Sequence, residues 1–363
     1  MTVVHPVIDG HNDLPWQLRT RGIDPDLRSD LSATGLHTDL ARLERGGVAG
    51  QFWSVYVPCG VSEPESVATV LEQIDLVKRL AARYPDRLAL VTTADQAERA
   101  RSEGRVASLL GAEGGHCINS SLGVLRMLYE LGVRYLTLTH ADNTSWADSA
   151  TDRRKLGGLS AFGHEVVREM NRLGMLVDLA HVSTETMHAA LDTSVAPAFF
   201  SHSSARAVCD HPRNVPDDVL TRVRATNGVV MVTFVPFFLN EQCRQWGNEL
   251  YAFEDALDAP PQSPEWVAQQ KAWVAAHPCP PSGVADAADH IEHIRAVAGV
   301  DAVGLGGDFD GTPVLPDGLN DVTTYPALFA ELADRGWSDA ELDKLGWANA
   351  LRVLRDTEAA AEH

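Results

Sequence analysis

An alternation of short apolar runs with amphipathic stretches constrains the fold of this chain more than any other feature. Each run is bounded by glycine or polar residues. The stretches between them, such as those that begin at Pro64, Ser121, Ser160 and Val215, repeat their apolar residues at helical spacing. This alternation is typical of a parallel sheet with crossover helices. The eight runs cover residues 7–13, 48–57, 106–115, 133–143, 175–183, 196–204, 228–236 and 303–311.

Eight strand and helix units in 363 residues predict an α/β fold, a (β/α)8 TIM barrel that forms a single domain over residues 1–363. Two further helices, from Thr323 and from Ser338, would close the ring. An open doubly wound sheet is the alternative, and the lack of a GxGxxG segment before a helix weakens it. In a barrel of this kind the active site lies at the carboxyl ends of the strands.

A long insertion follows the seventh predicted strand, over residues 237–283. It is rich in proline and carries Trp246, Trp266 and Trp273. A connection of this length is usually a lid, an interface element or an extra subdomain. The sequence leaves these three roles open.

Charge and cysteine content exclude several classes of protein. Thirty Lys and Arg stand against 50 Asp and Glu, with no basic cluster, so no nucleic acid partner is expected. Five cysteines without a CxxC pair argue against a disulfide scaffold and against a thiolate zinc site. The longest uncharged apolar stretch, residues 228–239, is too short to span a bilayer, and neither end of the chain carries a leader or lipid-anchor signal. The expectation is a soluble cytoplasmic protein without a membrane partner.

Polar residues at the ends of the predicted strands form the candidate site. A polar group after four or five apolar residues must face the barrel mouth or be buried at a cost. Of 14 histidines, four meet this condition, and several carboxylates do as well. Imidazole nitrogens and carboxylate oxygens are the ligands that zinc and similar ions prefer. The selected residues are His11, His140, His181, His202, Asp13, Glu113, and either Asp308 or Asp310.

Three rival interpretations of the polar residues are weaker. His290 and His293 lack the HExxH spacing of metalloproteases, which favours a solvated helix face. The serines at 201, 203 and 204 lie beside His202, but no GxSxG elbow accompanies them. The DFDG segment at residues 308–311 lacks the later ligands of a calcium-binding EF-hand.

Several long segments resemble the membrane (renal) dipeptidase family. They are VIDGHNDLPWQLR, VASLLGAEGGH, LGVRYLTLTHADNTSWAD, FSHSSARAVCDHPRNVPDDVL and AVGLGGDFDG, and with further matches they cover nearly the whole chain in order. The resemblance implies a metallo-dipeptidase with two Zn²⁺ per chain on an amidohydrolase-type barrel. It also implies free dipeptides as substrates, including those with a C-terminal D-residue, and a homodimer.

The resemblance further implies a role for each site residue. His11 and Asp13 would bind the first zinc, His181 and His202 the second, and Glu113 would bridge both. A hydroxide between the two ions would attack the peptide carbonyl.

The catalytic and substrate-binding roles also come from the resemblance. His140 would stabilise the oxyanion, Asp308 would handle the proton and meet the substrate amino group, and Arg213 would pair with the terminal carboxylate. Two alternatives stay open: the same metal centre acting on another small amide or lactam, and a barrel that binds without catalysis.

The chain departs from its secreted relatives in its cysteines. Cys59 lies in the WSVYxPC motif of the family, but Asp142 stands where those relatives have a second cysteine, so that bridge cannot form. Cys209 and Cys243 remain as a candidate pair, which a reducing cytoplasm would keep as thiols.

Overall fold

The computed structural model describes residues 5–24 and 26–361 and contains a closed parallel β-barrel. Its strands pair in the order β2-β1-β9-β8-β7-β6-β5-β4, and a further pairing of β2 with β4 closes the ring. The closure confirms the predicted TIM barrel and excludes the doubly wound sheet. The strands of the ring are β1 (Val7–Asn12), β2 (Val48–Tyr56), β4 (Val106–Glu113), β5 (Val133–Thr137), β6 (Leu176–Asp178), β7 (Phe199–Phe200), β8 (Val229–Val232) and β9 (Val303–Leu305).

Each of the eight predicted runs contains one strand of the ring, but the strands are shorter than the runs. The run at residues 196–204 contributes only Phe199–Phe200 to the sheet, because its polar half leaves the ladder to form a loop at the barrel mouth. The prediction missed β3 (Leu88–Leu90), which pairs with the start of β4. Three residues are too few to show the alternation that marks a strand in a sequence.

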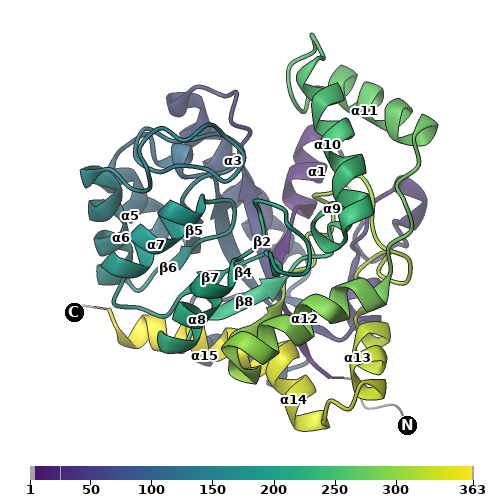
Figure 1. Ribbon diagram of the computed structural model, residues 1–363. Helices are drawn as coiled ribbons and strands as arrows, with labels where there is room; N and C mark the ends of the chain where they lie inside the picture. The colour runs from purple at the N-terminus through teal and green to yellow at the C-terminus, as the bar shows by residue number, and fades with distance from the viewer. Residues whose placement is uncertain (1–4, 25, 362–363) are drawn as a thin grey trace.

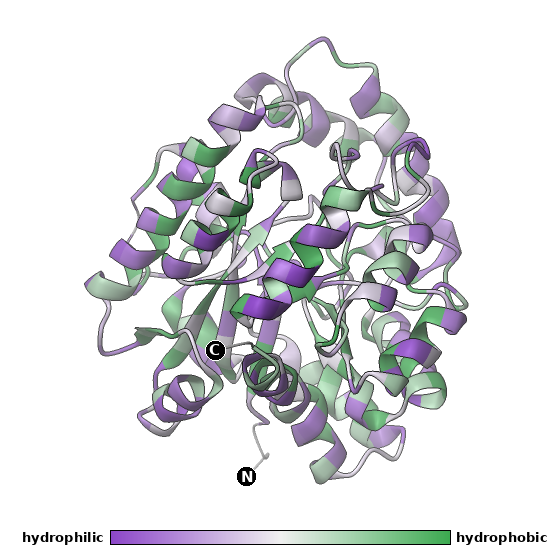
Figure 2. Ribbon diagram, turned by 90° about the vertical axis from the view of Figure 1, so that its left-hand side faces the viewer, coloured by the Kyte–Doolittle hydropathy of each residue, from purple (hydrophilic) through white to green (hydrophobic). Residues whose placement is uncertain are grey.

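Helices surround the barrel in Figure 1, and most of those in view in Figure 2 mix hydrophilic and hydrophobic residues along their length. Serine side chains cap several of them. Ser121, Ser160 and Ser183 each accept a hydrogen bond from a backbone N–H of the first turn. The helices of the ring and its flanks are α1 (Leu14–Arg21), α2 (Leu40–Arg45), α3 (Glu63–Arg83), α4 (Ala94–Ser102), α5 (Leu122–Glu130), α6 (Ala161–Leu173), α7 (Thr184–Thr193), α8 (Asp217–Ala225), α12 (Val284–Ala298), α13 (Tyr325–Asp334), α14 (Asp339–Asp343) and α15 (Asn349–Ala359).

An aromatic layer fills the inside of the barrel. The rings of Phe52, Tyr135 and Phe199 are buried, with centroids 5.2 to 5.9 Å apart. Gly111 on β4 makes room for this layer, because a Cβ at that position would lie 1.9 Å from Cζ of Tyr135. The layer fixes the height at which the Tyr135 hydroxyl stands in the barrel.

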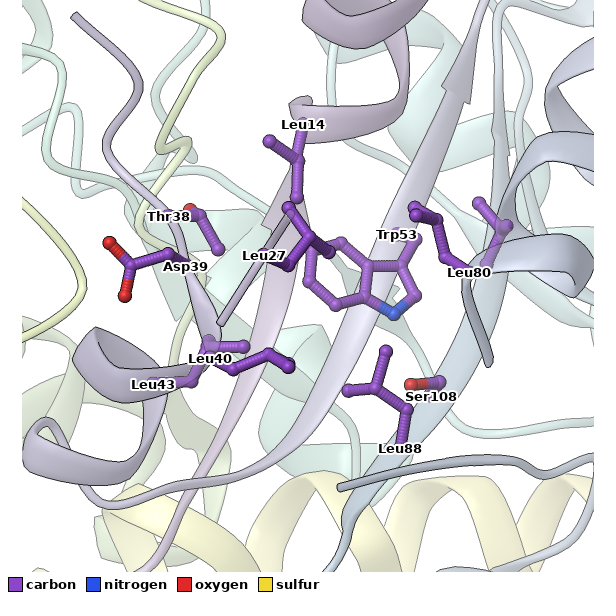
Figure 3. A pocket seen from close by; sticks show the side chains of 11 residues that line it. Leu14, Leu27, Thr38, Asp39, Leu40, Leu43, Trp53, Leu80, Leu88 and Ser108 are labelled. Atoms are coloured by element: carbon purple, nitrogen blue, oxygen red, sulfur yellow. The ribbon is translucent and has the colours of Figure 1, made fainter. Parts of the chain in front are cut away.

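An apolar cavity lies between the barrel and the helices, near the start of α1 (Figure 3). Its walls include Leu14, Leu27, Trp53 and Leu80, with Asp39 at one side. The Asp39 carboxylate is already engaged by the N–H of Arg42 and by its guanidinium. The hydroxyls of Thr38 and Ser108, which also line it, are hydrogen-bonded to Asn12 and to the carbonyl of Val106. The cavity is therefore a gap in the helix-to-sheet core, and no free polar group faces it from the described residues.

The insertion after β8 is helical, with α9 (Pro236–Leu239), α10 (Glu241–Asp255) and α11 (Pro264–Ala276). In Figure 1, α10 and α11 stand at the upper right, above α9. They share a small core of their own in which Phe237, Trp246 and Trp273 meet. None of the helices within the described residues is both long enough and apolar enough to cross a membrane.

The expectation of a solvated face was wrong for His290, whereas the thiols expected at Cys209 and Cys243 are present. His290 is fully buried on α12, where Nδ1 accepts from the backbone N–H of Ala205 and Nε2 donates to the carbonyl of Leu239. The prediction of a solvated face holds only for the partly exposed His293. Cys209 and Cys243 are free thiols, and the thiol of Cys243 donates to the backbone carbonyl of Pro280 at 3.3 Å.

Candidate metal centre

The carboxyl ends of the barrel strands bring the predicted polar residues together. His11 lies on β1 and Glu113 ends β4, while the others follow their strands within three residues. Three overlapping groups of side chains have ligand atoms within 4.8 Å of one another. The groups are His11, Glu113 and His202; Glu113, His140 and His181; and His11, Asp13 and Asp308.

Glu113 lies at the centre, and its two oxygens face different histidines. Oε2 lies 3.3 Å from Nε2 of His11. Oε1 lies 3.0 Å from Nε2 of His181 and 3.5 Å from Nε2 of His202. Ser54 donates a hydrogen bond of 3.0 Å to Oε2. The carboxylate is thus shared between two groups of donors, which is the arrangement that a bridge between two cations requires.

The donor set fits divalent cations. Nε2 of His181 and Nε2 of His202 lie only 2.9 Å apart, and Nε2 of His11 lies 3.2 Å from Oδ2 of Asp13. Oδ1 of Asp13 is buried without a hydrogen-bond partner among the described residues. Buried lone pairs at this spacing would be costly without a proton or a cation between them. Nitrogen and oxygen donors in this proportion suit zinc and similar ions.

Two of the histidines are oriented by buried partners. Ser201 donates to Oδ2 of Asp178 at 2.6 Å, so its oxygen must accept from Nδ1 of His202, 2.7 Å away. Nδ1 of His11 lies 2.9 Å from the hydroxyl of Tyr135. Both contacts occupy Nδ1 and leave Nε2 to face Glu113. Outer partners of this kind fix the tautomer and ring orientation of metal-binding histidines.

His140 lies at the edge of the cluster. Its Nε2 is 3.8 Å from Oε1 of Glu113, and its ring packs against those of His181 and Tyr56, with centroids 4.3 and 4.8 Å away. Burial lowers the pKa of His140 to about 4. The imidazole is therefore neutral at pH 7 and carries one N–H.

Asp308, rather than Asp310, joins the cluster. A Cβ on Gly311 would lie 2.3 Å from both Oδ1 of Asp308 and Oδ2 of Asp13, so these two carboxylates share one space. Asp310 instead accepts from the backbone N–H of His37 at 2.7 Å. Burial raises the pKa of Asp308 to about 7, and the neighbouring carboxylates Asp13 and Glu113 act in the same direction.

Two residues of the cluster have a left-handed backbone conformation. His181 has a φ of 66° and Asp308 a φ of 60°, a region that residues with a Cβ rarely adopt. Each costs roughly 1 to 3 kcal/mol and persists only where the surrounding structure fixes it. Here the conformation turns each side chain back over the barrel mouth.

Arg213 is a buried cation without a carboxylate partner. It follows β7 and is 2% exposed, with its guanidinium carbon 5.3 Å from the ring centroid of Phe238. Nη2 donates to the carbonyl of His202 at 3.2 Å and Nη1 to Ser203 Oγ at 3.4 Å, while Nε has no partner within the part of the chain that the structure describes. No salt bridge joins Arg213 to any described carboxylate. Such a group is prepared to bind an anion.

The sequence did not point to the residues that support the site. Tyr135 and Asp178 sit inside apolar runs and read as core positions, and Ser201 was weighed only as a nucleophile. The only hint in the sequence is that each of these three residues lies in the same apolar run as a histidine of the cluster. The sequence connects Cys59 only with a disulfide that cannot form. Its Sγ lies 3.7 Å from Nδ1 of His140, a contact between two loops that the sequence does not predict.

Comparison with known proteins finds relatives that match nearly the whole chain. The family model described as membrane dipeptidase (Peptidase family M19) matches residues 1–363. An uncharacterized dipeptidase of Schizosaccharomyces pombe is 44% identical over 368 residues, covering 97% of this chain and 81% of that protein. Dipeptidase 3 of Mus musculus is 42% identical over 366 residues, covering 98% of this chain and 65% of its own length.

Solved structures share the fold. The structure described as dipeptidase AC, a metallo peptidase of family M19, has a TM-score of 0.82 at 25% identity and covers 98% of this chain and 99% of its own. A metallo peptidase from Rhodobacter sphaeroides, solved with a phosphinate mimic of the dipeptide L-Ala-D-Ala, has a TM-score of 0.79 at 24% identity and covers 98% and 100%. From the family match over its whole length, this chain belongs to the membrane dipeptidase family, Peptidase family M19, of metal-dependent peptide-bond hydrolases.

Proposed function

We propose that the chain is a zinc-dependent dipeptidase that holds two zinc ions and hydrolyses the peptide bond of free dipeptides. The proposal depends on one observation: the two oxygens of Glu113 face different histidines. One oxygen lies near His11, and the other lies near His181 and His202. Membership of the M19 family supports the choice of reaction.

Five residues would hold the metals. His11 and Asp13 are assigned to one ion, His181 and His202 to the other, and Glu113 to both. Bound there, the ions would polarise a peptide carbonyl and lower the pKa of a water molecule. The aromatic layer below the cluster and the partners of Nδ1 would keep the ligand atoms in place before any ion arrives.

His140 and Asp308 are the side chains that would donate to the substrate carbonyl and transfer the proton. The neutral His140 would donate from Nε2 to the carbonyl oxygen as negative charge develops on it. Asp308 would take the proton of the attacking water and deliver it to the leaving amine.

Specificity for dipeptides would follow from Arg213 and Asp308. The buried guanidinium would pair with the terminal carboxylate, and Asp308 would meet the ammonium group at the other end. A longer peptide would have to bury an unpaired charge or a blocked terminus. We extend the proposal to dipeptides with a C-terminal D-residue, since the Rhodobacter neighbour binds a mimic of L-Ala-D-Ala.

A substrate panel tests this function. The zinc-loaded protein should hydrolyse L-Ala-L-Ala and L-Ala-D-Ala, and should leave N-acetyl-L-Ala-L-Ala, L-Ala-L-Ala amide and a simple lactam nearly untouched. Equal rates on the blocked compounds or the lactam would instead assign the site to small amides in general. A protein that binds no zinc and is inert toward the whole panel would be a binding barrel, and the proposal would be wrong.

A further inference from the structure

Cys59 stands next to His140 without being part of the metal cluster. It follows β2 as a free, half-buried thiol, and its Sγ lies 3.7 Å from Nδ1 of His140. The same sulfur accepts the backbone N–H of Asp142 at 3.4 Å. Cys59 forms no disulfide within the described residues, so its sulfur keeps the S–H.

The hydrogen atoms around His140 can be placed one by one. A thiol offers one S–H donor and a weak sulfur acceptor, and a neutral imidazole offers one N–H and one lone pair. The N–H of Asp142 already uses the sulfur as acceptor, which leaves the S–H of Cys59 for the lone pair of Nδ1. The ring hydrogen of His140 then lies on Nε2, on the side of Oε1 of Glu113, 3.8 Å away.

The other tautomer fits the surroundings less well. It would direct two N–H groups, from Asp142 and from Nδ1 of His140, at one sulfur and leave the S–H with no acceptor among the described residues. It would also point the lone pair of Nε2 toward the Glu113 carboxylate. Burial raises the pKa of Cys59 to about 11, so the thiol keeps its hydrogen at neutral pH.

We propose that Cys59 is a positioning residue that holds His140 in the tautomer with its hydrogen on Nε2, through a hydrogen bond from the thiol to Nδ1. The inference rests on the proposed function, because a hydrogen on Nε2 is what His140 needs in order to donate to the substrate carbonyl oxygen. The opposite tautomer would meet that oxygen with a lone pair.

The tautomer can be measured without turnover. In the zinc-loaded protein labelled with ¹⁵N-histidine, the resonances of His140 are assigned by their loss in His140→Asn. The parent should show a protonated Nε2 and an unprotonated, hydrogen-bonded Nδ1. Cys59→Ala should shift His140 toward a mixture of tautomers. A parent with its hydrogen on Nδ1, or a Cys59→Ala spectrum equal to that of the parent, would overturn the inference.

Kinetics supply the second readout. One lost hydrogen bond of ordinary strength corresponds to a fall in kcat of roughly 3- to 10-fold, with KM and zinc content unchanged. Cys279→Ala, which removes a thiol in the insertion, is the matched control and should match the parent. In a His140→Asn background, Cys59→Ala should cost nothing further, whereas a full additive loss would contradict action through His140.

The proposed function and the positioning role of Cys59 can be disproved independently. His140→Asn alone tests the assigned role of His140 in turnover. The spectrum of Cys59→Ala tests the hydrogen bond whatever that role is.

Discussion

Oε1 of Glu113 lies 3.0 Å from Nε2 of His181, and this contact joins the end of β4 to the loop after β6 across the mouth of the barrel. The other oxygen of the same carboxylate faces His11 on β1. One side chain therefore connects the two groups of donors, and both lose their common partner if its charge is removed.

Glu113→Gln should lower the zinc content from two ions per chain to one or none, since an amide offers a single neutral oxygen. Turnover should fall by more than about 100-fold, since loss of even an outer partner of a ligand costs about 10- to 100-fold. Metal analysis after gel filtration, together with dipeptide hydrolysis, checks both. A variant with two tightly held zinc ions and the parent rate would show that Glu113 does not bridge.

Ser201→Ala should weaken zinc binding by about 10- to 100-fold, because it removes the hydroxyl between Asp178 and Nδ1 of His202. Competition with a chelator measures the affinity. Ser204→Ala is the matched control, since the Ser204 hydroxyl is buried on the same loop and has no hydrogen-bond partner among the described residues. Equal affinities for the two variants would contradict the orienting role of Ser201.

His290 should make the free energy of unfolding depend on pH. Burial lowers its pKa from 6.5 to about 4, so the unfolded chain takes up the proton first. The stabilisation by neutral His290 is fully present above pH 6.5 and is lost as pH falls toward 4.

The test compares the parent with His290→Gln by urea unfolding at pH 7.5 and pH 4. The variant should be less stable at pH 7.5, and the difference should shrink by about 3 kcal/mol at pH 4, since one pKa unit corresponds to about 1.4 kcal/mol. A difference that does not change with pH would mean that His290 does not titrate in this range.

Arg213→Met should reduce kcat/KM on free dipeptides by about 100-fold or more while two zinc ions stay bound. Each charge-assisted hydrogen bond to the substrate carboxylate is worth roughly 1.5 to 3 kcal/mol. A dipeptide amide lacks that carboxylate, so it should be a poor substrate for the parent. The substitution should reduce kcat/KM on the amide far less than on the free dipeptide. Equal losses of kcat/KM on both substrates would show that Arg213 supports the loop and does not bind the terminal carboxylate.

The barrel could be predicted because the eight apolar runs are long enough to carry a pattern, whereas β3 has three residues and was missed. The gathering of His11, Glu113, His181 and His202 followed from their common position at strand ends, which a barrel brings to one face. Their roles in binding and catalysis stay predictions that the variants above test.

The supporting contacts could not be predicted. Tyr135 reaches His11 only because Gly111 lets its ring cross the barrel, and this depends on the register between β4 and β5. His290 was misjudged because its partners, Ala205 and Leu239, come from distant segments. Sequence periodicity describes one helix at a time and holds no information on such contacts.

A zinc titration of the metal-free protein tests the central claim most directly, with hydrolysis of L-Ala-D-Ala and bound zinc measured at each point. The account predicts that zinc binds with a stoichiometry of two per chain and that activity reaches its maximum as the second ion binds. The dipeptide amide should stay nearly inert throughout. Full activity with no zinc bound, or two bound ions with no hydrolysis of any dipeptide, would contradict it.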